Sequence, residues 1–214
     1  MPELKICGVN DAEFAREAVR LGADYIGMIF APDSPRRVDV ETACEIARHA
    51  GGAKLAGVFT SSGAGEIASI AQRAALDVVQ LHGKYGACDV KALKAHAFEV
   101  WRLDDGEGSL GEDATIVDGR DGEKCGGTGR VADWTRIKQL KAEKRKVVLA
   151  GGIGCDNIEA AVATGADIVD VNSSLESQPG VKCVGKLVRF MTAFNAAKQN
   201  LNHTGRQTHG KLSK

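Results

Sequence analysis

The stretch GADYIGMIF, residues 22–30, contains the unit from which much of the chain is built. Gly22 ends a helical pattern, Asp24 follows it, and the apolar run after the aspartate indicates a buried strand. The same arrangement returns as GADI at residues 165–168, and a weaker version, ALDV, stands at residues 75–78. The sequence therefore predicts a repeated supersecondary unit in which a helix is followed by a strand.

Eight short apolar runs, separated mostly by helical patterns, are the predicted strands. They cover residues 4–7, 25–30, 55–59, 78–81, 98–101, 115–117, 147–150 and 168–171. Near-continuous apolar strands that alternate with helices are typical of a parallel sheet covered on both faces. Eight units in 214 residues favour a closed (β/α)₈ TIM barrel over a flavodoxin-like open sheet, which is the competing architecture.

The predicted barrel is a single catalytic domain over residues 1–198, followed by a polar and disordered tail over residues 199–214. Residues 104–113 are rich in glycine and lack a helical pattern, so the helix after the fifth strand is expected to be short or missing. At the first helix, Asn10 and Glu13 have the spacing of a capping box.

Charge and cysteine content exclude several classes of protein. The 28 basic and 28 acidic residues cancel, so we expect no binding of nucleic acid or of an anionic membrane. The beginning of the chain has no secretory pattern and no run is long enough to span a bilayer, which predicts a soluble cytoplasmic protein. The six cysteines form no C-x-x-C pair, so neither a zinc site nor a disulfide framework is indicated.

Cys7 and Asp118 are the candidate proton-transfer groups, because each stands where a predicted strand ends. The plainer interpretations are a buried small hydrophobe for Cys7 and a solvated turn residue for Asp118. In a barrel, however, active sites form on the loops that follow the strands. If both side chains face that mouth, a thiolate can remove a proton from a substrate while a carboxylic acid delivers one.

Anion-binding segments are expected on both sides of the same mouth. Residues 126–129, 151–152 and 172–174 are rich in glycine or serine, follow the last three strands, and suit a phosphate group. Across the mouth, Arg36 follows the second strand and has the planar fork that holds a carboxylate. His82, after the fourth strand, is either a further substrate contact or a satisfied polar residue.

A family resemblance rests on motifs that occur in a fixed order over residues 4 to about 195. The motifs are KICG at 5–8, SPR at 34–36, GVF at 57–59, QLHG at 80–83, GGTG at 126–129, LAGG at 149–152 and DVNSSLE at 170–176. Together with Asp118 they resemble the phosphoribosylanthranilate isomerases of tryptophan biosynthesis. The chain departs from the family pattern at Ala132, Ser174 and Cys183.

The resemblance implies a cofactor-free and metal-free Amadori rearrangement of a small phosphorylated substrate, N-(5-phosphoribosyl)anthranilate, by a monomer or a homodimer. Asp118 would be the general acid and Cys7 the general base, while Arg36 would hold the anthranilate carboxylate. The phosphate-binding residues that it implies are Gly127, Gly129, Gly152 and Ser173.

Three alternatives remain at this point. The related aldose-ketose isomerase of histidine biosynthesis would be expected to have an aspartate where this chain has Cys7. A dual-substrate enzyme would be expected to show two related phosphate-binding regions, whereas this sequence contains one recognisable region. A barrel without activity, which binds a sugar phosphate and senses redox state through Cys7, belongs to a different class. Residues 119–129, with their glycines and charges, are expected to form a mobile lid.

Overall fold

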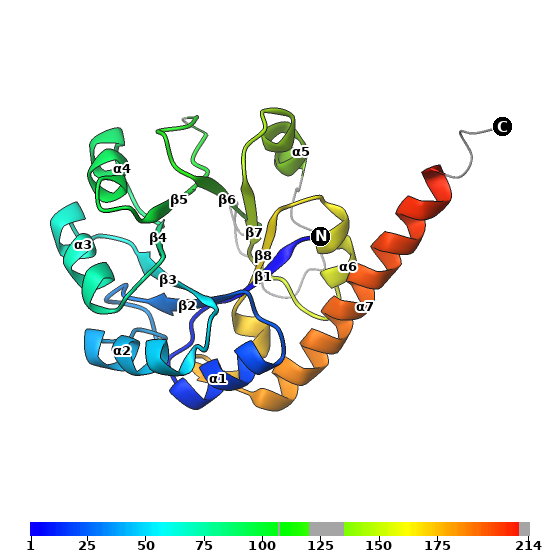
Figure 1. The fold of residues 1–214 in the computed structure, drawn as a ribbon, viewed down its shortest axis with the longest axis horizontal. Helices are drawn as coiled ribbons and strands as arrows, with labels where there is room; N and C mark the ends of the chain where they lie inside the picture. The colour runs from blue at the N-terminus through cyan, green and yellow to red at the C-terminus, as the bar shows by residue number, and fades with distance from the viewer. Residues whose placement is uncertain (107, 120–134, 210–214) are drawn as a thin grey trace.

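The computed structural model describes residues 1–106, 108–119 and 135–209, with side chains up to residue 201. Its centre is a closed barrel of parallel strands, paired in sequence order with β1 next to β8 (Figure 1). The strands are β1 Glu3–Ile6, β2 Tyr25–Ile29, β3 Lys54–Phe59, β4 Val78–Leu81, β5 Glu99–Leu103, β6 Ala114–Asp118, β7 Val147–Ala150 and β8 Ile168–Val171. The predicted TIM barrel is confirmed, and the open flavodoxin-like sheet was the wrong alternative.

Helices surround the barrel (Figure 1). They are α1 Ala12–Arg20, α2 Val40–His49, α3 Ala64–Arg73, α4 Ala87–Lys94, α5 Thr135–Ala142, α6 Ile158–Ala163 and α7 Val184–His209. Between β8 and α7 lie a short 3₁₀ helix, η1 Ser173–Leu175, and a small hairpin made of β9 Glu176–Gln178 and β10 Val181–Lys182. The described residues between β5 and β6 contain no helix, as the glycine-rich sequence predicted.

The start of α1 differs from the predicted capping box. The N-cap is Asp11 rather than Asn10, and the Asp11 carboxylate accepts a hydrogen bond of 2.7 Å from the backbone N–H of Phe14. Asn10 instead donates from its side chain to the carbonyl of Gly180 in the β9–β10 turn. A carboxylate beside the positive end of the helix dipole is the stronger cap, which explains the shift by one residue.

The repeated sequence unit has a structural counterpart at the amino-terminal ends of the strands. Asp24, Asp77, Asp113 and Asp167 precede the even-numbered strands, and each carboxylate accepts from a backbone N–H at the start of the preceding odd strand at 2.7–2.9 Å. The backbone N–H of each aspartate in turn donates to the carbonyl of the odd-strand residue whose N–H its carboxylate accepts. This reciprocal contact, the aspartate tie, joins β1 to β2, β3 to β4, β5 to β6 and β7 to β8.

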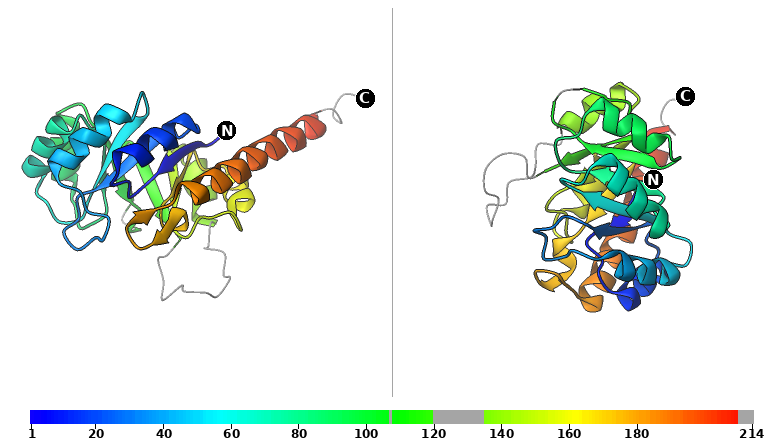
Figure 2. Two further views of the ribbon diagram at one scale, coloured as in Figure 1. Left: turned by 90° about the horizontal axis from the view of Figure 1, so that it is seen from below. Right: turned by 90° about the vertical axis from the view of Figure 1, so that its left-hand side faces the viewer.

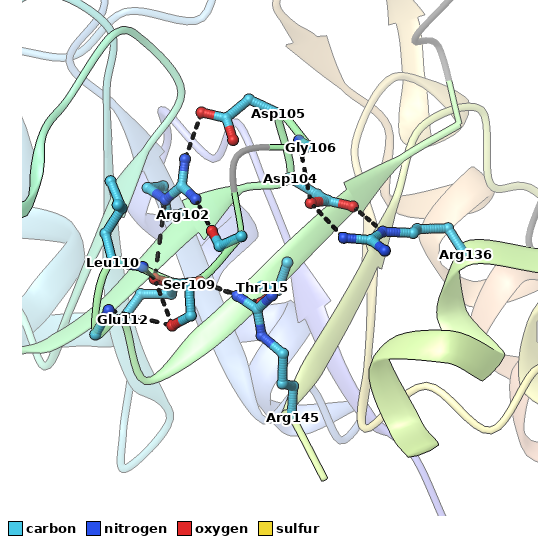
Figure 3. A network of polar contacts seen from close by, with 12 residues as sticks. Arg102, Asp104, Asp105, Gly106, Ser109, Leu110, Glu112, Thr115, Arg136 and Arg145 are labelled. Carbon is cyan, nitrogen blue, oxygen red and sulfur yellow. Dashed lines mark hydrogen bonds and ion pairs between the residues drawn. The ribbon is translucent and has the colours of Figure 1, made fainter. Parts of the chain in front are cut away.

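A charged network takes the place of the missing helix between β5 and β6 (Figure 3). Arg102 on β5 is buried and pairs with Asp105, while its Nη2 donates to the carbonyl of Gly108 at 2.5 Å. The Glu112 side chain is 1% exposed and accepts from the backbone N–H of Leu110, and it also pairs with Arg145. Here hydrogen bonds and ion pairs cover a barrel face that the apolar side of a helix would otherwise cover.

Helix α7 packs Phe190 and Phe194 into the core, and its second half extends away from the barrel (Figure 2). The helix runs on to His209, through residues expected to be a disordered tail. The domain end at residue 198 stays a prediction, and residues 210–214 lie outside the described part. Within the described chain, no helix combines the length and apolar character needed to cross a bilayer.

Ala75 occupies the position held by glycine in the other two copies of the repeat, with φ of 50° compared with 103° at Gly22 and 81° at Gly165. A left-handed conformation at a residue with a Cβ costs about 1 kcal/mol, and Ala75 is exposed, so no packing is lost with its methyl group. Ala75→Gly should therefore raise the free energy of unfolding by about 1 kcal/mol in urea titrations. Gly165→Ala is the matched reverse change and should lower it. A lower free energy of unfolding in Ala75→Gly would contradict the view that the left-handed backbone at Ala75 destabilises the fold.

Glu112→Ala should lower the free energy of unfolding by about 3–5 kcal/mol, because it removes the buried carboxylate that pairs with the partly buried Arg145 and lies 3.8 Å from the buried Arg102. Glu13→Ala is the control, since the exposed pair of Glu13 with Arg16 should contribute less than about 1 kcal/mol. Equal losses in the two variants would show that the charged network does not stabilise the β5–β6 segment.

Candidate active site

A pocket of about 230 Å³ opens at the carboxyl ends of the strands. Parallel closure brings these ends together, so residues distant in sequence line one cavity. Its walls are Cys7, Ile29, Ala31, Ser34, Val58, Thr60, Gln80, His82, Asp118, Ala150, Gly151, Gly152, Ile153, Asp170, Asn172 and Ser173. Of the predicted site residues, Cys7, His82, Asp118, Gly152 and Ser173 meet in this pocket.

Cys7 directly follows β1 and lies at the floor of the pocket, where it is 5% exposed. Its thiol packs with Ile29 and Val58, the upper apolar layer inside the barrel. Burial raises the pKa of the Cys7 thiol, and the neighbouring Lys5 opposes that shift without cancelling it. The thiol therefore faces substrate space, and its deprotonation needs help from its surroundings.

Asp118 is the last residue of β6 and lies on the wall formed by β6 and β7. A Cβ at Gly151 would lie 2.1 Å from its Oδ1, and Gly151 has a φ of 85°. The site thus needs glycine at position 151 for two reasons, the backbone conformation and the space that the carboxylate takes. Asp118 and Cys7 line the same cavity from β6 and β1, as an acid and a base acting on one substrate must.

The side chain of Asn157 bridges the turn after β7. Its Oδ1 accepts from the N–H of Gly154 at 2.9 Å, and its Nδ2 donates to the carbonyl of Gly152 at 3.0 Å. Gly152 has a φ of 67°, and a Cβ added there would meet no atom within 4 Å. Ser173, at the beginning of η1, lines the same side. The predicted residues Gly127 and Gly129, and most of the predicted lid, lie outside the described residues.

Arg36 lies beside the pocket but does not line it. Its Nε and Nη2 donate to the two carboxylate oxygens of Glu176 at 2.6 and 2.7 Å, and Lys182 contacts the same carboxylate at 3.1 Å. Burial would raise the pKa of Glu176, but Arg36 and Lys182 lower it to about 2. A Cβ at Gly8 would lie 2.7 Å from Cδ of Arg36 and 2.6 Å from Oδ1 of the pocket residue Asn172. The arginine is therefore fixed at the rim, with its Nη1 edge left for a ligand.

His82 follows β4 and contacts the side chain of Gln80, whose Nε2 lies 2.5 Å from Nε2 of the imidazole. The donor and the acceptor in this contact are set by the tautomer of the imidazole. The Gln80 side chain is buried and lines the pocket, and its Oε1 has no hydrogen-bond partner among the described residues. That oxygen is an acceptor for a substrate hydroxyl or N–H group.

Sequence reasoning did not select Lys5, Gln80 and Asp170 as functional residues, although Gln80 and Asp170 line the pocket. All three are nearly fully buried. The sequence does mark them, because each is a polar or charged residue inside an otherwise apolar strand run. Burying such a group costs free energy of folding unless the group is paired or serves a function. Glu176 was likewise missed as the partner of Arg36.

Comparison with known proteins identifies the family. The family model described as N-(5'phosphoribosyl)anthranilate (PRA) isomerase matches residues 4–193. The isomerase of that name from Campylobacter jejuni is 35% identical over 199 residues, which are 89% of this chain and 98% of the relative. The phosphoribosyl anthranilate isomerase structure from Thermus thermophilus has a TM-score of 0.80 and 31% identity, and covers 91% of this chain and 98% of its own.

A further isomerase structure contains reduced 1-(o-carboxyphenylamino)-1-deoxyribulose 5-phosphate. It has a TM-score of 0.79 and 27% identity over 92% of this chain and all of its own length. The barrel, the pocket at the carboxyl ends of its strands and these matches agree with one another. The chain belongs to the N-(5'-phosphoribosyl)anthranilate isomerase family.

Proposed function

We propose that the chain catalyses the Amadori rearrangement of N-(5-phosphoribosyl)anthranilate to 1-(2-carboxyphenylamino)-1-deoxyribulose 5-phosphate, with Asp118 as general acid and Cys7 as general base. The observation that carries the proposal is that both side chains line one pocket from different strands. Family membership and the reduced product bound in a relative support the same reaction.

Ring opening is the first step. Asp118 donates a proton to the furanose ring oxygen while the bond from that oxygen to C1′ breaks, and the electron pair of the anilino nitrogen forms the C1′ iminium. The Asp118 carboxyl group at the end of β6 is suited to this step because it lines the pocket in which the substrate would lie.

Proton removal at C2′ follows. The Cys7 thiolate takes that proton, and its bonding electrons neutralise the iminium to give an enolamine. The thiol then returns a proton to C1′, and the 2′-hydroxyl loses its proton to the Asp118 carboxylate as the ketone forms. Atoms and charges balance, and both groups return to their starting states without a cofactor.

Two anion sites suit the two ends of this substrate. The turn with Gly152 and the segment beginning at Ser173 offer backbone N–H groups for the phosphate, and Gly127 and Gly129 are proposed to complete this site. On the opposite rim, Arg36 is proposed to hold the anthranilate carboxylate through Nη1. A substrate carried between these sites would place its ribose over Cys7 and Asp118. We further propose a cytoplasmic enzyme that is a monomer or homodimer and binds no nucleic acid.

The decisive experiment is a fluorescence assay that follows consumption of phosphoribosylanthranilate, with the histidine-pathway isomerase substrate run in parallel. Turnover of the first substrate alone supports the proposal. Turnover of the second would favour a dual-substrate enzyme, and no turnover of either would favour the redox-sensing barrel.

Cys7→Ala and Asp118→Ala should each lower kcat by at least ~100-fold, the usual contribution of a positioned acid or base. Circular dichroism and thermal unfolding should show an intact fold in both. Cys88→Ala is the matched control, because Cys88 is exposed on α4 and should leave kcat unchanged. Turnover near the wild-type rate in either site variant would remove that residue from the mechanism.

Arg36→Met should raise KM for phosphoribosylanthranilate by at least ~10-fold and change kcat less, because a charge-assisted contact to the substrate is lost in the ground state as well as the transition state. The control is Arg37→Met, whose side chain is exposed next to Arg36. If the two variants give the same KM, the carboxylate is held elsewhere.

A further inference from the structure

A buried ion pair that the proposed mechanism does not use lies inside the barrel next to Cys7. Lys5 on β1 is fully buried, and its Nζ lies 2.6 Å from Oδ2 of Asp170 on β8. The two residues are register partners across the β1–β8 seam, so their side chains point to the same side of the sheet. Such a pair is expensive to bury, and replacing it with apolar side chains is often neutral or stabilising. Fold stability alone therefore gives a weak reason for its presence.

Lys5 extends into the same space as the sulfur of Cys7. Lys5 and Cys7 are two residues apart along one extended segment, so both point into the barrel. A Cβ at Gly27 on β2 would lie 3.0 Å from Nζ of Lys5 and 3.0 Å from Sγ of Cys7. The ammonium group and the thiol therefore border the same space that glycine leaves open, and the charge of Lys5 acts on the thiol.

The other ionisable groups around Cys7 are placed less directly or are already paired. Lys182 on β10 and Arg36 after β2 carry positive charge, but both are bound to Glu176. Across the pocket are His82 after β4 and Asp118 on β6. Asp170 is the nearby anion, and its Oδ2 is bound to Lys5. Lys5 is thus the cation that lies beside the sulfur in the space left by Gly27.

We propose that Lys5 is a positioning residue of the reaction, whose ammonium group stabilises the Cys7 thiolate and holds the sulfur toward the pocket. This inference rests on the proposed role of Cys7 as the general base. The physical need is clear, because an apolar floor disfavours an anion and burial raises the pKa of the thiol. A positive charge close to the sulfur offsets part of that cost.

Asp170 keeps the ammonium group charged. Burial alone lowers the pKa of Lys5, whereas the charges of Asp170 and Cys7 raise it above its ordinary value. The same carboxylate also repels a thiolate, so it acts on Cys7 in the opposite direction from Lys5. Removing Lys5 and removing Asp170 should therefore shift the pKa of Cys7 in opposite directions. A purely structural role of the pair predicts no such difference.

Lys5→Met leaves the Asp170 anion near the sulfur and should move the rising limb of kcat/KM against pH upward by at least about one unit. Asp170→Asn leaves the cation without its anion and should move that limb downward. The double variant, Lys5→Met with Asp170→Asn, contains no unpaired buried charge and should fold like the wild type, with its limb between those of Lys5→Met and the wild type. Lys54→Met, at the opposite end of the barrel, is the control for loss of one lysine charge and should move nothing.

Thiolate content is measured without substrate as the rate of iodoacetamide alkylation at Cys7 between about pH 6 and 10, with the Cys7 peptide quantified by mass spectrometry. At about pH 7, Lys5→Met should react at least ~10-fold more slowly than wild type, and Asp170→Asn faster. Cys7→Ser gives the background from the other cysteines. If Lys5→Met does not fold, the comparison of Asp170→Asn with the double variant tests the same difference.

Shifts of both single variants in the same direction, or an unchanged alkylation profile in Lys5→Met and the double variant, would overturn the proposal. Failure of the proposed function gives a different pattern. In that case the wild type does not turn over phosphoribosylanthranilate. Alkylation of Cys7 is still fastest in Asp170→Asn and slowest in Lys5→Met.

Discussion

Closure of the sheet at the β1–β8 seam is the constraint on which the rest of the structure depends. The strands pair over four register positions, and one of these places Lys5 beside Asp170 inside the barrel. An ion pair in this interior is costly to bury, but once formed it opposes any slip of the two strands, because a one-residue shift would turn a charge into the apolar outer layer. The same contact that fixes the register also sets the electrostatic surroundings of the residue at the end of β1.

The layers inside the barrel explain why chemistry is confined to one end. At the amino-terminal end, Tyr25 and Trp101 pack edge to face with ring centroids 5.1 Å apart, and they fill the interior together with aliphatic neighbours. The Lys5–Asp170 pair lies along the interior, and the small cluster containing Cys7 forms the floor of the pocket. Water and substrate thus reach the thiol from the pocket above it, where the acid and the anion sites also lie.

The sequence predicted the barrel because its signal was repeated eight times, with boundaries within one or two residues of those observed at each strand. Cys7, Asp118 and Ser173 could be selected because each follows, or nearly follows, a recognisable apolar run. The pairing of Arg36 with Glu176, and of Lys5 with Asp170, could not be derived in the same way. Each pair joins residues more than a hundred positions apart, and only the closed geometry brings them into contact. The cap at Asp11 was missed for a different reason, since two adjacent residues competed and a local electrostatic preference decided between them.

The four aspartate ties join strands in consecutive pairs, and none of them joins β2 to β3, β4 to β5, β6 to β7 or β8 to β1. The barrel is therefore a ring of four two-stranded modules at its amino-terminal rim. Between modules the strands are joined there by backbone hydrogen bonds and by partly exposed ion pairs, such as those of Glu99 with Lys54 and Lys146, which contribute little to stability. A division of the polypeptide after β4 leaves every tie intact within one fragment or the other, whereas a division after β3 or β5 separates the two members of one. Half-barrels of β1–β4 and β5–β8 are thus the natural units for fragment complementation and for exchange between homologues.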